Sequence, residues 1–361
     1  MTESPGRWQA PGRVNLIGEH LDYNGGPVLP IAINRRTVVT VARSGSTRVS
    51  ARTRGDVDCV FDVTVRPGEV EGWGAYVAGV VWSLGDAGHQ VPGLDIDVES
   101  DVPIGAGLSS SAALECSVAV AIRDFAGLRV DDVALALLAQ RAENDFVGVP
   151  SGSMDQLASM TGRRGHAVLI DTATSGVQGV PAGWSDDGLA LVVVDTRARH
   201  SLGDGQYAAR RAQCEDAARH LGVQWLADAD LDAAERLDDP TLVRRARHVV
   251  TETARVRAAV DALAAGDWLR LGRLFLDSHA SMRDDFQISC PELDTAVAAA
   301  VRAGALGARM TGGGFGGSAI ALAPVARVEA IEDACCTAFR RARFRAPHVF
   351  VVEPADGASP V

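Results

Sequence analysis

The stretch "DVPIGAGLSSSAALE", residues 101–115, places a glycine-rich turn and three serines at the start of a predicted helix. The residues before it, "LDIDVES" at 94–100, alternate apolar and polar side chains, as strands do. Glycines let backbone N–H groups approach an anion, and the first turn of a helix favours negative charge. One serine would be enough to cap the helix. The pattern therefore favours a phosphate-binding loop over a simple capped turn.

The segments around this loop predict a mixture of strands and helices. A helix over 110–126 would end at Gly127, and a second helix over 131–146 would begin with Asp131 as its N-cap. Residues 207–303 are predicted to be mainly helical, with a further helix near 326–342, and the tail from 354 is predicted to be disordered. Apolar or alternating patterns predict strands at 37–43, 94–100, 166–171, 189–196, 318–324 and 348–353.

Composition narrows the possible functions. The 361 residues are enough for two ordinary domains, and the net charge of −11 argues against a nucleic-acid-binding surface. No run of apolar residues suggests a secretion signal or a membrane span. The six cysteines are scattered without a CxxC pair, which disfavours a zinc site and is typical of reduced, buried residues. We therefore expect a cytoplasmic protein without nucleic-acid or membrane partners.

The sequence contains no lysine, so all 35 basic residues counted as Lys or Arg are arginines. This excludes a Walker A lysine, a protein-kinase strand lysine, a Schiff base and a Ser-x-x-Lys pair. Any phosphate that the protein binds must therefore be held by arginine, by backbone N–H groups or by a metal ion.

A second polar cluster lies near the N-terminus, in "APGRVNLIGEHLDYNGG" at residues 10–26. Four side chains able to bind hydroxyl groups follow one another beside a glycine-marked turn: Arg13, Glu19, His20 and Asp22. Some of them could serve only solubility. Their concentration in one turn favours a site for a small polar molecule.

Two more stretches carry candidate chemistry. In "RAENDFVGVPSGSMDQLAS", residues 141–159, Glu143 would ordinarily be a solvated helix residue and Asp155 an N-cap. Beside a phosphate loop, a carboxylate could instead hold Mg²⁺ opposite a serine. In "MTGGGFGGSAIAL", residues 310–322, the glycines match G-x-G-x-x-G but precede a strand, so a dinucleotide site is disfavoured.

Taken together, the chain resembles the GHMP superfamily of small-molecule kinases, and within it the galactokinases. Residues 12–26 resemble the galactokinase signature, 103–113 the ATP-phosphate loop, and 310–322 the third motif of the superfamily. The segments 151–156 and 195–215 also resemble galactokinase segments, in the same order. The resemblance extends over essentially the whole chain.

This resemblance implies the fold and the reaction. We expect an α/β N-terminal domain, residues 1–165, and an α+β C-terminal domain, residues 166–361, with the active site in the cleft between them. ATP with Mg²⁺ would be the phosphoryl donor and the anomeric hydroxyl of galactose the acceptor. The enzyme is expected to act as a monomer.

The resemblance also implies a role for residues that match the motifs. Sugar contacts are expected from Glu19, His20, Asp22, Gly152 and Tyr207. Asp155 would face the hydroxyl to be phosphorylated, as the general base, with Arg13 beside it.

The resemblance also implies which residues contact the nucleotide and the metal ion. Ser111 and Glu143 would hold Mg²⁺, and Trp73 and Tyr76 would flank the adenine. The phosphates would lie against Gly105, Gly107, Ser109, Ser110 and Ser111.

The sequence departs from the family pattern at Leu21, where many members carry threonine, and at Ser151, where cysteine often precedes the glycine. Neither change removes a group that the chemistry needs. Three alternatives stay open at this point: a kinase for another sugar such as N-acetylgalactosamine, a non-catalytic galactose sensor, and a nicotinamide-dependent oxidoreductase, which the context of the glycine loop disfavours.

Overall fold

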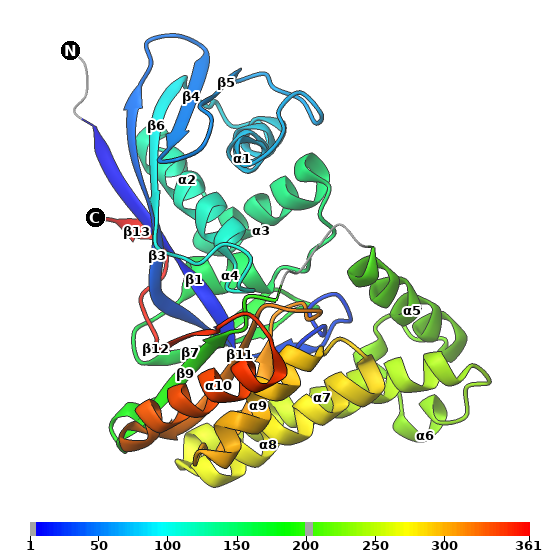
Figure 1. Ribbon diagram of the computed structural model, residues 1–361. Coiled ribbons are helices and arrows are strands. Elements are labelled where there is room, and N and C mark those ends of the chain that lie inside the picture. The colour runs from blue at the N-terminus through cyan, green and yellow to red at the C-terminus, as the bar shows by residue number, and fades with distance from the viewer. Residues whose placement is uncertain (1–4, 199–204) are drawn as a thin grey trace.

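A computed structural model describes residues 5–198 and 205–361 of the chain (Figure 1). It consists of an upper and a lower half in the view of Figure 1, each built on a sheet with helices packed against it. No helix in the described part of the chain is long and apolar enough to cross a membrane.

The first half is built on a six-stranded sheet in the order β13-β1-β3-β6-β4-β5, antiparallel except for the parallel pair β4 and β6. Its strands are β1 (Gly6–Asn15), β3 (Pro30–Arg43), β4 (Arg48–Thr53), β5 (Cys59–Asp62), β6 (Leu94–Ser100) and β13 (Ser359–Pro360). The helices of this half are α1 (Gly74–Asp86), α2 (Ser110–Ala126), α3 (Asp132–Arg141) and α4 (Met154–Thr161). They lie on one face of the sheet, with α2 and α4 against β1 and β3 (Figure 1).

The second half is built on a four-stranded antiparallel sheet in the order β10-β11-β9-β12. Its strands are β9 (Leu189–Asp195), β10 (Gly307–Thr311), β11 (Ser318–Pro324) and β12 (His348–Val352). The helices are α5 (Gln206–Leu221), α6 (Leu231–Ala234), α7 (Pro240–Ala265), α8 (Trp268–Ser281), α9 (Pro291–Arg302) and α10 (Val328–Ala342). Short 3₁₀ turns lie at Gly183–Ser185, Leu226–Asp228 and Val325–Arg327.

Two strand pairings join distant parts of the chain. In a three-stranded sheet, the central strand β7 (His166–Asp171) pairs with β2 (Pro27–Val28) on one side and with β8 (Gly176–Pro181) on the other. The last strand, β13, returns to pair with β1. The pairings of β2 with β7 and of β1 with β13 each join a strand before residue 165 to a strand after it. The division into domains 1–165 and 166–361 therefore stays a prediction.

Most elements predicted from the sequence pattern are present. Helix α2 has the predicted bounds and ends at Gly127, whose φ of 65° is left-handed, and Asp131 caps α3 by accepting from the Ala134 N–H group at 2.8 Å. The expected disorder of the C-terminal tail is wrong, because its backbone groups pair with β1 although its side chains are small or polar.

The predicted helix over 131–146 is in fact two elements. Its α-helical part ends at Arg141, and a π-helical turn, Ala142–Val147, follows. A second π-helical turn, Met282–Phe286, extends α8. Such turns are frequent at functional sites, and the first of them carries Glu143.

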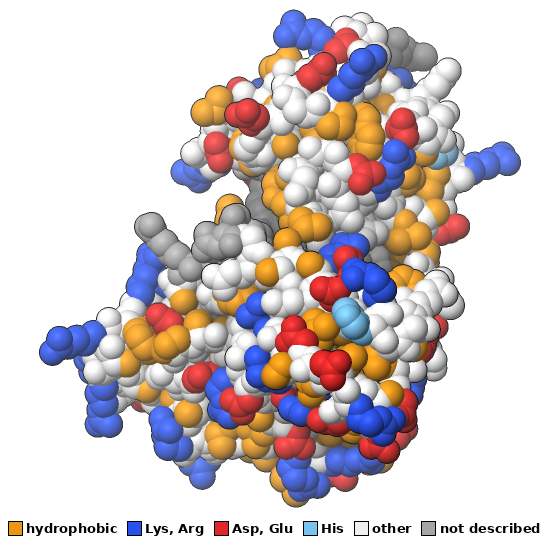
Figure 2. Space-filling model, turned by 90° about the vertical axis from the view of Figure 1, so that its right-hand side faces the viewer, with side chains coloured by type: hydrophobic (Ala, Val, Ile, Leu, Met, Phe, Trp, Pro, Cys, Tyr) orange, Lys and Arg blue, Asp and Glu red, His pale blue; other side chains and the backbone are white. Residues whose placement is uncertain are grey.

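Acidic and basic side chains are interspersed over the face of the molecule in Figure 2, without a continuous basic patch.

Candidate active site

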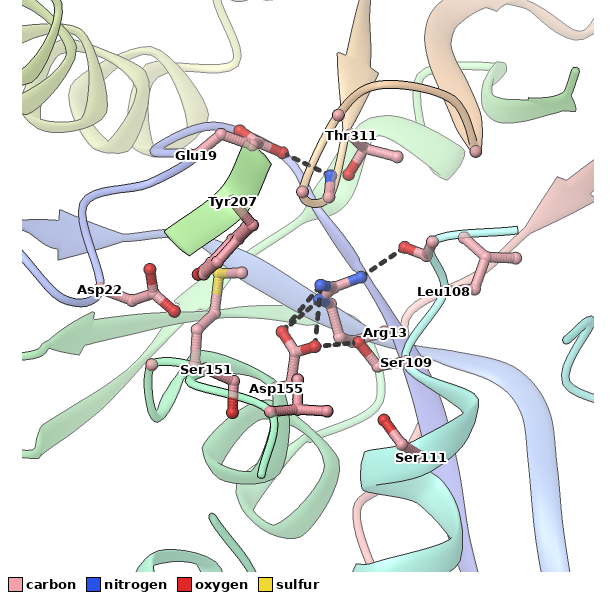
Figure 3. A pocket seen from close by; sticks show the side chains of 18 of the residues that line it. Arg13, Glu19, Asp22, Leu108, Ser109, Ser111, Ser151, Asp155, Tyr207 and Thr311 are labelled. Atoms are coloured by element: carbon pink, nitrogen blue, oxygen red, sulfur yellow. Dashed lines mark hydrogen bonds and ion pairs between the residues drawn. The ribbon is translucent and has the colours of Figure 1, made fainter. Parts of the chain in front are cut away.

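An open cleft lies where the two halves of the structure meet (Figure 3). Segments that are far apart in the sequence line it: the end of β1 and the loop after it, the turn before α2, the π-helical turn after α3, the loop before α4, the start of α5, and the glycine-rich loop between β10 and β11. Its lining includes Arg13, Glu19, His20, Asp22, Gly105, Gly107, Ser109, Ser110, Ser111, Glu143, Ser151, Gly152, Asp155, Tyr207 and Gly312 to Gly314. The structure thus brings together all the predicted site residues except Trp73 and Tyr76.

Close backbone contacts hold these segments in place. The Arg13 N–H group donates to the Leu108 carbonyl at 3.1 Å, and a side chain at Gly12 would come within 2.6 Å of the same oxygen. Further on, the Thr311 hydroxyl donates to the Asn15 carbonyl at 2.9 Å. The end of β1 is therefore fixed both to the turn before α2 and to β10.

The Arg13 guanidinium binds the Asp155 carboxylate in a two-pronged geometry. Its Nε atom donates to Oδ1 at 2.8 Å and its Nη2 atom to Oδ2 at 2.9 Å, while Nη1 donates to the Gly107 carbonyl at 2.6 Å. Arg13 is 5% exposed. A guanidinium carries five N–H groups, so two of them make none of these three hydrogen bonds, and Arg13 lines the cleft.

Asp22 lies across the cavity from Asp155, next to Tyr207 (Figure 3). Burial, together with the nearby charge of Asp155, raises the pKa of Asp22 to about 7. Gly152 makes this position possible, because a Cβ atom there would overlap the Asp22 carboxylate. The glycine of "PSGSM" is thus required for space rather than for backbone freedom.

His20 is buried, and both of its ring nitrogens have partners. Its Nε2 atom lies 3.1 Å from the Gly313 carbonyl and must carry the proton, so Nδ1 accepts from the Tyr23 hydroxyl at 2.6 Å. Burial lowers the pKa of His20 to about 3, so the ring is neutral. His20 therefore joins the signature loop to the glycine-rich loop. Its predicted contact with a sugar hydroxyl stays a prediction.

Glu19 is also tied to the glycine-rich loop, through a buried ion-pair network that the sequence analysis missed. Arg309 on β10 pairs with Glu19 and lies 3.4 Å from Glu252 on α7, and the Gly312 N–H group donates to Glu19 at 3.2 Å. All three charged side chains are almost fully buried.

The two acids of this network differ in their pKa shifts. Burial raises the pKa of Glu19, against the opposing effect of Arg309. Burial acts in the same direction on Glu252, but Arg255 and Arg309 outweigh it and lower the pKa of Glu252 to about 2. The signal for this network was an arginine inside the apolar strand pattern "GARMT", since a buried arginine requires an acidic partner.

Glu143 is a buried carboxylate that accepts several hydrogen bonds. Gln156 and Ser151 donate to its Oε2 atom at 2.8 and 2.9 Å, and Ser111 also bonds to the carboxylate. Burial and the charge of Asp155 raise the pKa of Glu143, which a divalent cation would reverse.

No group of three or more His, Cys, Asp or Glu side chains in the described residues could hold a metal ion alone. Mg²⁺ is usually bound by one or two carboxylates together with substrate phosphates. The donor set of Ser111 and Glu143 fits that mode.

The turn before α2 offers backbone donors. Gly105 and Gly107 have left-handed φ values of 76° and 72°, and Ser110 and Ser111 open the helix beside them.

Trp73 and Tyr76 lie at the start of α1, where Trp73 donates to the Val57 carbonyl at 3.0 Å. Neither is among the described residues that line the cleft, and their contact with adenine stays a prediction.

Family comparisons agree with this site. Residues 1–43 match the galactokinase galactose-binding signature, 75–163 the GHMP kinase N-terminal domain, and 259–341 the GHMP kinase C-terminal domain. Residues 1–4 of the first match and 199–204 of the galactokinase-like segment 195–215 lie outside the described part of the structure.

Individual relatives extend the match over the full length. A galactokinase from Streptomyces coelicolor is 50% identical over 99% of this chain and 94% of its own, and one from Mycobacterium tuberculosis is 48% identical over 97% and 98%. The crystal structure of Lactococcus lactis galactokinase complexed with galactose superposes with a TM-score of 0.94, at 33% identity over 99% of this chain and 96% of that one.

Mevalonate kinase from Methanococcus jannaschii, 16% identical over 98% of this chain and 99% of its own, superposes with a TM-score of 0.70 and shares the fold. The fold therefore has the expected α/β and α+β composition of GHMP kinases. With the signature, the full-length relatives and the cleft in agreement, the chain belongs to the galactokinase family of the GHMP kinases and is a sugar kinase, a phosphotransferase.

Proposed function

We propose that this enzyme transfers the γ-phosphoryl group of ATP to the C1 hydroxyl of D-galactose, giving galactose 1-phosphate and ADP. This is the first committed step of galactose metabolism. The enzyme would act in the cytoplasm as a monomer. Its six cysteines, all unpaired, are consistent with a reducing compartment.

The observation that carries this proposal is the Arg13–Asp155 pair. It lies where the galactose-binding signature, the turn before α2 and the glycine-rich loop meet. A carboxylate at that place can accept a proton from a sugar hydroxyl, and the neighbouring arginine can stabilise negative charge on a phosphoryl group. Both are needed at the same point of the cleft.

In the reaction, the Asp155 carboxylate accepts the proton of the C1 hydroxyl while the oxygen of that hydroxyl forms a bond to the γ-phosphorus. The bond between that phosphorus and the β–γ bridging oxygen breaks, and ADP leaves with the electron pair. Because the transition state of phosphoryl transfer is loose, most of the catalysis comes from positioning and charge stabilisation. The spare N–H groups of Arg13 supply charge stabilisation that a lysine provides in other kinases.

Backbone donors of Gly105 to Ser110 would hold the phosphates, and Ser111 and Glu143 would hold Mg²⁺. When bound, Mg²⁺ would neutralise phosphate charge. Glu19, His20, Asp22, Gly152 and Tyr207 would surround the sugar. A carboxylate that accepts a hydrogen bond from a sugar hydroxyl discriminates between epimers, because the wrong epimer leaves it unpaired.

The specificity is tested by measuring ADP release with Mg-ATP and a panel of galactose, glucose, N-acetylgalactosamine and arabinose. We expect turnover mainly with galactose. In the Asp22→Ala variant, we expect the KM for galactose to rise at least tenfold, equivalent to about 1.4 kcal/mol, with the KM for ATP nearly unchanged. Preference for another sugar would overturn the substrate assignment, and an equal rise of both KM values would overturn the role of Asp22.

A further inference from the structure

Ser109 adopts a backbone conformation that its side chain does not favour. It has φ 59° and ψ 50°, in the left-handed region where glycine is the preferred residue. It also occupies the N-cap position of α2, where serine normally accepts a hydrogen bond from the helix backbone. Within the described chain, its side chain makes no such capping bond. Neither local propensity nor capping explains why a serine stands here.

The Ser109 hydroxyl is directed to another element. Its Oγ atom donates to Oδ2 of Asp155 on α4, the oxygen that also accepts from Nη2 of Arg13. Figure 3 shows Asp155 with Arg13 and Ser109 on one side and with Asp22 and Tyr207 across the cavity. Ser109 is 9% exposed. The Asp155 carboxylate, which already accepts hydrogen bonds from Arg13, thus accepts one from a second side chain as well.

This contact conflicts with the predicted role of Ser109 as a phosphate ligand. A serine has a single O–H group, whereas phosphate oxygens only accept hydrogen bonds. The hydroxyl therefore cannot donate to Asp155 and to a phosphate at the same time. A hydrogen bond to an ionised carboxylate is among the stronger ones that a hydroxyl makes.

We propose that Ser109 is a positioning residue for Asp155: it orients the carboxylate toward the sugar hydroxyl, at the expense of a strained backbone, and leaves the phosphates to Ser110 and the backbone. The inference rests on the proposed role of Asp155 as the base.

Two substitutions separate positioning from folding. Ser109→Gly removes the hydroxyl and relieves the left-handed strain, whereas Ser109→Ala removes the hydroxyl and keeps the strain. We expect the Tm of the glycine variant to equal or exceed that of the wild type, and the Tm of the alanine variant to lie below that of the glycine variant. Both should lose kcat by a similar factor, roughly tenfold or more, with the KM values for ATP and galactose nearly unchanged.

Ser175→Gly is the matched control. Ser175 has φ 58° in the turn between β7 and β8 and does not line the cleft in the described structure. Its replacement relieves the same kind of strain and should leave kcat unchanged. Full activity of Ser109→Gly would overturn the proposal, and so would a rise in the KM for ATP without a loss of kcat, which would restore Ser109 as a phosphate ligand.

A double-mutant cycle with Asp155→Asn tests whether Ser109 acts through Asp155. We expect Ser109→Gly to have little further effect on kcat in that background, because the two residues act as a unit. Independent, multiplicative losses would contradict the proposal. If Asp155→Asn alone kept its activity, Asp155 would not be the base. The single variant would then show that the proposed function fails, independently of any result for Ser109.

Discussion

At Asp22 the cleft holds a carboxyl group in surroundings that disfavour its charge. Its pKa of about 7 lies well above the ordinary 3.8, so between these two values the folded protein binds more protons than the unfolded chain. The contribution of Asp22 to the stability of the wild type therefore falls as the pH rises from about 4 to about 7 and is level above that range. The Asp22→Asn variant lacks this titration. We therefore expect the Tm of the variant minus the Tm of the wild type to increase as the pH rises over the same range.

The comparison requires Tm values for both proteins at about pH 5 and about pH 8. A Tm difference that is the same at both pH values would show that Asp22 has an ordinary pKa and that its burial beside Asp155 is not as described.

Single residues also show what the sequence could and could not predict. Arg13, Asp155 and Asp22 all line the cleft, and each belongs to a segment whose resemblance to galactokinase motifs implied a place in the site. The Arg309–Glu252 contact belongs to no such motif, and its partners are 57 residues apart on a strand and a helix. Only the tertiary fold, in which α8 packs against both α7 and β10, makes them neighbours, and the sequence pattern does not reveal that packing.

At the scale of elements, α8 approaches β10 through two facing glycines. A Cβ atom at Gly272 would overlap the Leu306 carbonyl, and one at Gly307 would overlap the backbone of Gly272. We expect Gly272→Ala to force the helix away from the strand and to lower the free energy of unfolding by roughly 1–3 kcal/mol, measured by urea denaturation.

Gly85→Ala provides the control for helix propensity. Gly85 lies in α1 on the surface, and a Cβ atom there would meet nothing within 4 Å. The same substitution should therefore raise stability, by up to roughly 0.5–1 kcal/mol. If Gly272→Ala were also stabilising, the close approach of α8 and β10 would be wrong.

Elements with a clear apolar or alternating pattern were the most predictable, as α2, β6, β7 and β11 show. The π-helical turn at Ala142–Val147 was not predicted, because its residues fit an ordinary helix equally well. This turn packs closely against α1: a Cβ atom on Gly79 would lie 3.1 Å from the Ala142 side chain.

At the scale of the whole molecule, the last residues of the chain join the two halves. After β12 the backbone donates from Ala355 to Ala32 at 2.9 Å, from Gly357 to Gly162 at 2.8 Å, and from Val361 to Arg7 at 2.9 Å. The composition "PADGASPV" suggested disorder, since it holds few large apolar side chains. Backbone pairing does not need them, which is why the sequence pattern failed here.

Truncation after Glu353 removes these bonds and the pairing of β13 with β1. At roughly 0.5–1.5 kcal/mol for each hydrogen bond, we expect the truncated protein to lose several degrees of Tm in a thermal melt. Deletion of Val361 alone should cost much less. An unchanged Tm for the long truncation would mean that the tail does not hold the halves together in solution.

The measurement that bears most directly on the whole account is galactose-dependent ADP release by wild type and Asp155→Asn, with galactose binding measured for both. We predict that the variant binds galactose with similar affinity and loses kcat by about 10²–10⁴-fold, the usual contribution of a general base. A variant that keeps kcat within a few-fold of the wild type would contradict the assignment of Asp155 and, with it, the mechanism proposed for the cleft.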